Sequence, residues 1–175
     1  MRLPHVLLAA AAAVATAGCA TTDGMMMSDQ TVTEIVVASP NHTTLEQAVV
    51  AANLAATLNG DGPFTVFAPT DTAFAALPAS LRTAAMNDTD LLSSVLTYHA
   101  VSGRVTAADL MAQIAAGGGT ANLTTVNGAT LRATMQGNFV RLTGANGSSA
   151  FVETADIGAS NGVIHSINGV LLPPM

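Results

Sequence analysis

The chain has 175 residues, of which half are hydrophobic, 9% are charged and 3% are aromatic. This length fits one domain, since domains commonly span about 100–200 residues. Eleven acidic residues against five arginines, with no lysine, give a net charge of −6. The chain therefore lacks the basic surface that a nucleic-acid binder or a polybasic lipid-surface binder needs.

The first 18 residues have the pattern of an export signal. Arg2 supplies a positive charge, and the apolar stretch from Val6 to Val14 follows it. This stretch is shorter than the roughly 20 apolar residues that a membrane-spanning helix requires. The next residues, Thr16-Ala17-Gly18-Cys19, resemble the lipobox of bacterial lipoproteins. We therefore predict a lipoprotein signal peptide over residues 1–18 and lipidation of Cys19, which makes the lipid anchor the only membrane contact.

The same segment leaves a second outcome open. Ala15-Thr16-Ala17 has the A-x-A form of a cleavage site that would release a soluble protein beginning at Gly18. In either case residues 19–31 are predicted to be a flexible tether, because they lack periodicity and contain Gly, Ser, Asp and Thr. The expected location is the cell envelope, as a lipoprotein of the outer membrane or cell surface, with a periplasmic or secreted protein as the alternative.

The folded domain is expected over residues 32–174, and its first half has mostly helical patterns. A capping box, Thr43-x-x-Glu46, precedes apolar residues at helical spacing and predicts a helix that ends at Asn59-Gly60. A buried strand is predicted from Phe64 to Ala68. The next helix should start near Thr70-Asp71 and end at Pro78. Phe67 on the strand, and Phe74 and Leu77 on this helix, are expected to face the core. Further helices are predicted over 88–96 and 109–115.

After Gly117-Gly118-Gly119 the pattern changes to short runs rich in β-forming residues. These runs cover 123–126, 130–135, 139–143 and 150–154, and Val163 to Leu171 has the alternation of a core strand. Asn127-Gly128, Gly137-Asn138 and Asn146-Gly147 separate the runs, and Asn161-Gly162 has the sequence of a tight turn. Helices followed by hairpins predict an α+β fold in which the helices pack against an antiparallel sheet.

No pattern typical of an enzyme or a cofactor site is visible in the sequence. His42, His99 and His165 have no second ligand at metal-site spacing, so no metal site is predicted. His99 and His165 are each expected to be a partly buried histidine that forms a hydrogen bond to the backbone. G-x-S-x-G, P-loop and G-x-G-x-x-G motifs are absent from the sequence. We expect a non-enzymatic protein without a cofactor; a hydrolase with an unrecognised site is the least favoured alternative.

Three stretches of the chain, in matching order and spacing, resemble the signature blocks of the fasciclin-like adhesion domain family. They are TVFAPTDTAFAALP (65–78), LTYHAVSGRVTAADL (96–110) and ADIGASNGVIHSINGVLLPP (155–174). The resemblance implies an α+β fold in which antiparallel strands form a wedge-shaped sheet with a cap of short helices. It is strongest to the small bacterial members with a single secreted or lipid-anchored domain.

The resemblance also implies a function. Members of the family bind and adhere without general catalytic activity, so it implies an adhesion module of the cell envelope that contributes to attachment or biofilm. Its partner would be an envelope or extracellular protein or a polysaccharide. Some relatives bind carotenoid, which makes a carrier of an apolar small molecule the alternative function.

The residues tied to adhesion in the family fall here on Tyr98, His99, Asp156 and Ile157, which are our candidate binding residues. A structural role competes with binding at each of them. For Tyr98 and His99 we favour the structural role, because they lie between the apolar pair Val95-Leu96 and Val101. For Asp156 and Ile157 the two roles stay equally open.

Overall fold

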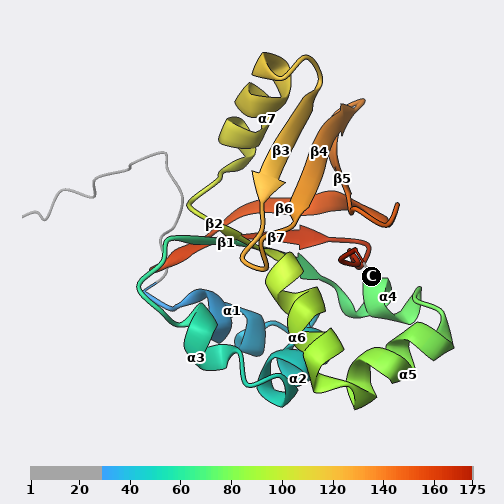
Figure 1. The fold of residues 1–175 in the computed structure, drawn as a ribbon. Helices are drawn as coiled ribbons and strands as arrows, with labels where there is room; N and C mark the ends of the chain where they lie inside the picture. Colours follow the sequence, from blue (N-terminus) through green and yellow to red (C-terminus); the bar gives the residue numbers. More distant parts are fainter. Residues whose placement is uncertain (1–28, 175) are drawn as a thin grey trace, which may run out of the picture.

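The computed structural model describes residues 29–174 of the chain, and this part contains seven helices and seven strands (Figure 1). The helices are α1 (Val32–Ala38), α2 (Thr43–Ala51), α3 (Ala55–Leu58), α4 (Asp71–Ala75), α5 (Ala79–Asn87), α6 (Thr89–Tyr98) and α7 (Ala107–Ala116). The strands are β1 (Phe64–Pro69), β2 (Ala100–Ser102), β3 (Thr120–Thr124), β4 (Thr130–Gln136), β5 (Phe139–Thr143), β6 (Ser149–Ala159) and β7 (Gly162–Ile167). The predicted α+β class is confirmed.

The strands form one sheet in the order β2-β1-β7-β6-β5-β4-β3. Neighbouring strands pair antiparallel, as predicted, except that β1 and β7 pair in parallel from Phe64 opposite Gly162 to Pro69 opposite Ile167. An isolated antiparallel bridge between Val101 and Thr125 joins the two ends of the sheet, so the sheet is nearly closed. β7, the last of the described strands, lies inside the sheet between β1 and β6.

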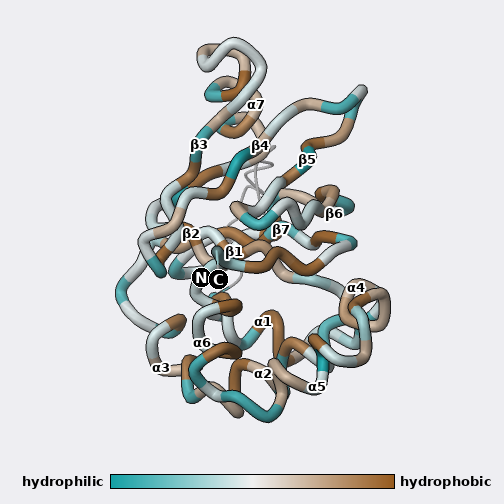
Figure 2. Tube along the Cα trace, turned by 45° about the vertical axis from the view of Figure 1, so that its right-hand side comes forward, coloured by the Kyte–Doolittle hydropathy of each residue, from teal (hydrophilic) through white to brown (hydrophobic). Residues whose placement is uncertain are grey.

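Helices α1 to α6 form a layer on one side of β1 and β7, and α7 packs beside β3 and β4 at the other end of the molecule (Figure 1). Two hydrophobic clusters result, one between the helical layer and the sheet and one between α7 and side chains from all seven strands. Hydrophobic stretches of β1 and of the helices beneath it stand out in Figure 2. Phe74 belongs to the first cluster and Phe67 to the second, which confirms that both are core residues.

The helix predicted from Thr43 to Asn59-Gly60 is two helices in the structure. α2 ends at Ala51, and Asn53 takes a left-handed conformation with φ of 54° before α3 begins. The predicted capping box at Thr43 is wrong, because the N-cap residue of α2 is His42 and its side chain makes no capping hydrogen bond. The carboxylate of Asp71 caps α2 instead, accepting from the backbone N–H groups of Thr43 and Thr44 at 3.3 and 2.7 Å.

Three elements have no counterpart in the predictions, namely α1, α5 and β2. α1 starts with a capping box between Thr31 and Glu34, at the predicted boundary between tether and domain. α5 buries none of its residues, so it has no apolar stripe to recognise, and β2 has only three residues. The predicted hairpin strands β3, β4 and β5 are present, and β6 is longer than its predicted core.

Asn161-Gly162 does more than form a turn. The side-chain oxygen of Asn161 accepts from the N–H of Val32 at 2.9 Å, and its amide nitrogen donates to the carbonyls of Leu58 and Gly60 at 2.7 and 3.1 Å. Gly162 begins β7 where that strand passes closely against β1, and a Cβ atom there would lie 2.0 Å from the carbonyl oxygen of Phe64. The pair therefore fixes β7 against both the helical layer and β1.

The predicted signal peptide, Cys19 and most of the predicted tether lie outside the described residues. Within residues 29–174, none of the helices combines the length and the apolar content needed to cross a bilayer.

Candidate functional site

Tyr98 is the last residue of α6 and is fully buried. α6 is an amphipathic helix whose first turn is capped by the carboxylate of Asp88, and its inward face carries Tyr98 into the core. The Tyr98 hydroxyl donates to the carbonyl of Thr130 at 3.1 Å and accepts from the N–H of Ala145 at 2.9 Å. Tyr98 thus joins α6 to the start of β4 and to the loop between β5 and β6.

His99 follows Tyr98 as the C-cap residue of α6 and is also buried. Its Nδ1 donates to the carbonyl of Val95 at 2.7 Å, and its Nε2 accepts from the N–H of Leu171 at 2.9 Å. These two partners require the neutral ring with its proton on Nδ1. Desolvation in the core lowers the pKa of His99 to about 4, although the bond to Val95 acts in the opposite direction.

Asp156 lies in an irregular part of β6, where the register against β7 shifts between Thr154 and Ile157. Its backbone has φ of 60°, in the left-handed region. Its Oδ1 accepts from the N–H of Ala107 at 2.8 Å, so Asp156 caps the first turn of α7 from another element. Ile157 pairs with Ile164 of β7, and its partly buried side chain packs against the cluster beneath the sheet.

His165 of β7 forms hydrogen bonds that hold the backbone at Asp156 in place. Its Nε2 donates to the carbonyl of Val105 at 2.8 Å, and its Nδ1 accepts from the N–H of Asp156 at 3.2 Å. The His165 ring also stacks on Phe67, with 5.4 Å between the ring centroids. Burial lowers the pKa of His165, so the neutral ring that these bonds require is favoured.

The four candidate binding residues serve two different parts of the fold. Tyr98 and His99 bond to the start of β4 and to the C-terminal segment, whereas Asp156 bonds to α7. The structure buries Tyr98 and His99 and leaves Asp156 and Ile157 partly exposed. A role in binding stays a prediction for all four residues.

A cleft that the sequence patterns did not indicate lies between α7, the turn joining β4 to β5, and β6. Leu110, Val140, Val152 and His165 line it as buried residues. Met111, Met135 and Phe139 line it as exposed apolar residues, with 47%, 39% and 61% of their surface accessible. Glu153, Ala155, Asn138 and Ala107 complete the lining, and the cleft holds about 240 Å³ of free volume. The only signal in the sequence is that Met135 and Phe139 flank the Gly137-Asn138 turn.

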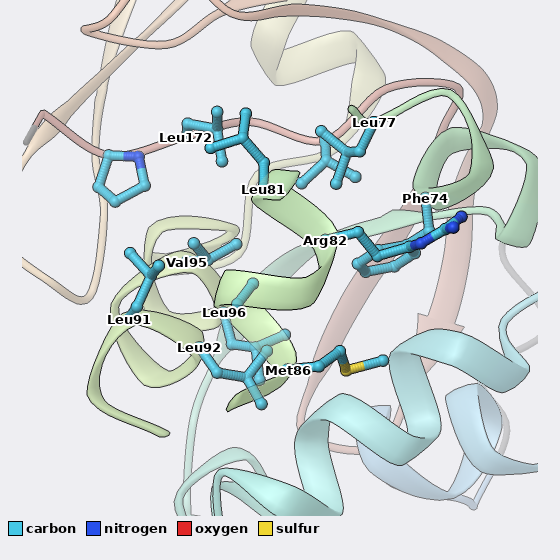
Figure 3. Close-up of a pocket in the computed structure, with 13 residues that line it drawn as sticks. Phe74, Leu77, Leu81, Arg82, Met86, Leu91, Leu92, Val95, Leu96 and Leu172 are labelled. Atoms are coloured by element: carbon cyan, nitrogen blue, oxygen red, sulfur yellow. The ribbon is translucent and has the colours of Figure 1, made fainter. Parts of the chain in front are cut away.

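A second hollow, the apolar groove, lies among α4, α5, α6 and the C-terminal segment (Figure 3). Leucines, Phe74 and Met86 make up much of its lining, and Arg82 is its one charged side chain. Its free volume is only about 30 Å³, close to the volume of one water molecule in the liquid. The side chains therefore nearly fill this groove.

Among residues 29–174, no three His, Cys, Asp or Glu side chains come together in a group that could hold a metal ion. The three histidines of this part of the chain are buried, and each has its ring nitrogens directed at partners within the protein. Their arrangement accounts for them as structural hydrogen-bonding groups.

Comparison with known proteins agrees with this architecture. The model of the Fasciclin domain matches residues 40–173. Protein sll1483 of Synechocystis sp. is 40% identical over 150 residues, covering 85% of this chain and 76% of that protein. The cell surface glycolipoprotein MPB83 of Mycobacterium bovis is 33% identical over 126 residues, covering 70% of this chain and 49% of that protein.

Among solved structures, the FAS1 domain pair of the insect cell adhesion molecule fasciclin I aligns with a TM-score of 0.67 at 21% identity, covering 82% of this chain and 51% of that one. This likeness supports the fold, because the topology is shared although the sequences have diverged. Together with the sequence matches, it shows that the chain belongs to the fasciclin domain family, which is implicated in adhesion and in extracellular roles.

Proposed function

We propose that this protein is a non-enzymatic binding module that mediates adhesion at the bacterial cell envelope. The observation that carries the proposal is the fasciclin domain over residues 40–173, since the related proteins are of the non-catalytic adhesion type. The hydrogen-bond network supports it as well, because Tyr98, His99 and His165 are engaged in holding the scaffold. The expected partner is an envelope or extracellular protein or a polysaccharide.

Attachment of cells tests this function. In the source bacterium, a strain lacking the protein is compared with the same strain complemented by the wild-type chain. We expect the deletion to reduce attachment to surfaces or biofilm, and complementation to restore it. Equal attachment of all strains would contradict an adhesive role.

The proposed anchor is a lipid on Cys19, which follows the apolar leader directly. The relative MPB83 is named as a cell surface glycolipoprotein, which supports such an anchor here. Stable attachment by lipid needs two or more chains, as lipoprotein processing supplies. Replacing Cys19 with Ser should therefore move the protein from the membrane fraction to the soluble fraction, detected by immunoblotting.

The soluble alternative has its own signature in that experiment. If the wild-type protein is already in the soluble fraction and its N-terminus begins at Gly18 or later, the lipid anchor is wrong and the protein is periplasmic or secreted. Replacing Ser28 with Ala in the predicted tether serves as the control variant, because it leaves the lipobox intact.

A carrier of an apolar small molecule is the second candidate. The apolar lining of the groove favours this candidate, whereas the size of the groove does not. The groove's free volume of about 30 Å³ argues against it, because small-molecule sites commonly enclose about 300–1,000 Å³. The visible absorption spectrum of the purified protein separates the two functions. A coloured protein would favour a carotenoid carrier, and a colourless one would favour adhesion.

A further inference from the structure

We propose that the cleft between α7, the β4–β5 turn and β6 is a docking site for a protein partner, which inserts an apolar side chain flanked by basic residues. This inference rests on the proposed binding function and names the class of partner. It identifies a site that differs from the candidate pair Tyr98 and His99, which the fold buries.

The first argument is the exposure of apolar surface at one place. Met111, Met135 and Phe139 are among the few large hydrophobic side chains that the described residues expose, and all three line this cleft. Contiguous exposed apolar surface commonly marks an interaction site. Unbranched methionine side chains on two sides of an opening can also adapt to the shape of an inserted group.

The second argument is the size and chemistry of the cleft. Its volume of about 240 Å³ is below the roughly 300–1,000 Å³ of typical small-molecule pockets, and it suits the anchor side chain of a protein partner. Met, Leu and Val dominate its walls, while both ring nitrogens of His165 are already bonded within the protein. A polysaccharide would find few free hydrogen-bonding groups here, so we favour a protein.

The third argument is charge. Glu153 is exposed and is the one acidic residue that lines the cleft, and the carboxylate of Asp156 accepts from the N–H of the lining residue Ala107. The residues that line the cleft include no arginine, and the chain has no lysine. Complementary charges at the rim of an interface orient the partner and discriminate against unsuitable ones. Basic residues beside the inserted side chain would meet this acidic rim.

The floor of the cleft is already fixed without a partner. His165 bonds to Val105 and to Asp156, and Asp156 bonds to the first turn of α7. Leu110 and Val152 are buried below the opening. A partner would thus meet a preformed cleft, and little of the binding free energy would be spent on ordering the protein.

The test uses three short blocked peptides, GRFRG, GEFEG and GRSRG, titrated into full-length protein carrying ¹³C-methyl methionine. Methyl NMR signals of Met111 and Met135 report on the cleft, and that of Met86 reports on the apolar groove. We expect GRFRG to shift the first two signals saturably and to leave Met86 unchanged. GEFEG should bind about fivefold more weakly, since opposite charges become like charges, and GRSRG should give no saturable shift.

Two variants sharpen the test. Phe139→Ser should weaken the binding of GRFRG, and Glu153→Gln should reduce its preference over GEFEG. Both side chains are exposed, so the fold should be retained, and circular dichroism checks this. Val50→Ser, which changes an exposed apolar residue of α2, is the matched control and should leave binding unchanged.

Several outcomes would overturn the proposal. They are the absence of saturable shifts, equal affinity for GRFRG and GEFEG, or a shift of Met86 in place of Met111 and Met135. A wild-type dimer that Phe139→Ser converts to a monomer, seen by light scattering, would instead make a second copy the occupant. If deletion strains lose attachment but the peptides do not bind, the docking site is wrong while the adhesive function stands. If the peptides bind but attachment is unaffected by the deletion, the adhesive function fails alone.

Discussion

The hydroxyl of Tyr98, the single tyrosine of the chain, forms two hydrogen bonds inside the fold. Its hydroxyl donates to Thr130 and accepts from Ala145, so a ring without the oxygen would leave two backbone groups without this partner. An unsatisfied buried group costs more free energy than a formed hydrogen bond contributes.

Tyr98→Phe should lower the free energy of unfolding by about 1–3 kcal/mol, because it removes the hydroxyl but keeps the ring. Urea denaturation followed by circular dichroism measures the change. Thr83→Ala, on the exposed side of α5, is the control and should stay within about 0.5 kcal/mol of wild type. A Tyr98→Phe protein with wild-type stability but reduced attachment would instead support a contact role for this residue.

Gly162→Ala should be among the most destabilising substitutions in the chain, with a loss of about 3 kcal/mol or more. The added Cβ would meet the carbonyl oxygen of Phe64 at 2.0 Å, so β7 would have to separate from β1. Gly128→Ala is the control, because Gly128 has a positive φ, which Gly162 does not, and open space where a Cβ atom would lie. Its cost should be only the conformational strain of about 1–2 kcal/mol. Equal thermal shifts for the two variants would refute the packing argument.

At the level of elements, helices α2 and α7 share an unusual way of starting. Each has a carboxylate from a distant part of the chain bonded to its first turn, Asp71 for α2 and Asp156 for α7. These contacts join α2 to α4 and α7 to β6. Helix starts in this molecule thus also serve as tertiary contacts.

Asp156→Ala should lower the free energy of unfolding by about 1–2 kcal/mol, because it removes the carboxylate that caps α7 while the left-handed backbone remains. Asp156→Asn should cost less, since asparagine keeps an acceptor oxygen and tolerates a positive φ. Thermal melts and attachment assays are run together on both variants. Loss of attachment in a fully stable Asp156→Asn protein would support the candidate binding role of Asp156.

Local sequence patterns predicted the elements that carry their own signals. α6 has both an amphipathic stripe and the capping residue Asp88, and β4 and β5 flank the Gly137-Asn138 turn. α5 lacked such a signal because none of its residues is fully buried. The cap of α2 depends on Asp71, which lies 28 residues after Thr43. Local patterns cannot report contacts of that kind, because the partners meet only in the folded chain.

The sequence predicted only part of the candidate site. The resemblance identified the segments around Tyr98 and Asp156, and the apolar residues before Tyr98 favoured its burial. The cleft could not be predicted, because α7, β4, β5 and β6 each contribute only part of its lining. The parallel pairing of β1 with β7 likewise depends on residues about a hundred positions apart, which no local periodicity records.

The whole molecule should become less stable as the pH falls. Burial lowers the pKa of His42, His99 and His165, so the unfolded chain binds more protons than the folded chain below the ordinary histidine pKa of 6.5. Stability is then fully present above about pH 6.5 and declines toward pH 4. For His99 alone, a shift from 6.5 to about 4 corresponds to about 3 kcal/mol.

Melting temperatures measured between about pH 7.5 and about pH 5 test this effect. The carboxylates stay ionised in this window, because their ordinary pKa values lie below it. We expect a progressive decrease through this window. A melting temperature that is constant over the window would mean that the three histidines are not held neutral in the fold.

The position of β7 has a consequence for how the chain can fold. β7 is the last of the described strands along the chain and lies inside the sheet between β1 and β6, so β1 and β6 each lack one neighbour until residues 162–167 have been synthesised. Contacts between distant segments form late, because the loop between them must close first. A chain that emerges from its N-terminus thus cannot complete this core before residues 162–167 have emerged. For the export that we propose, this order of strands leaves the chain time to cross a membrane while it is still extended.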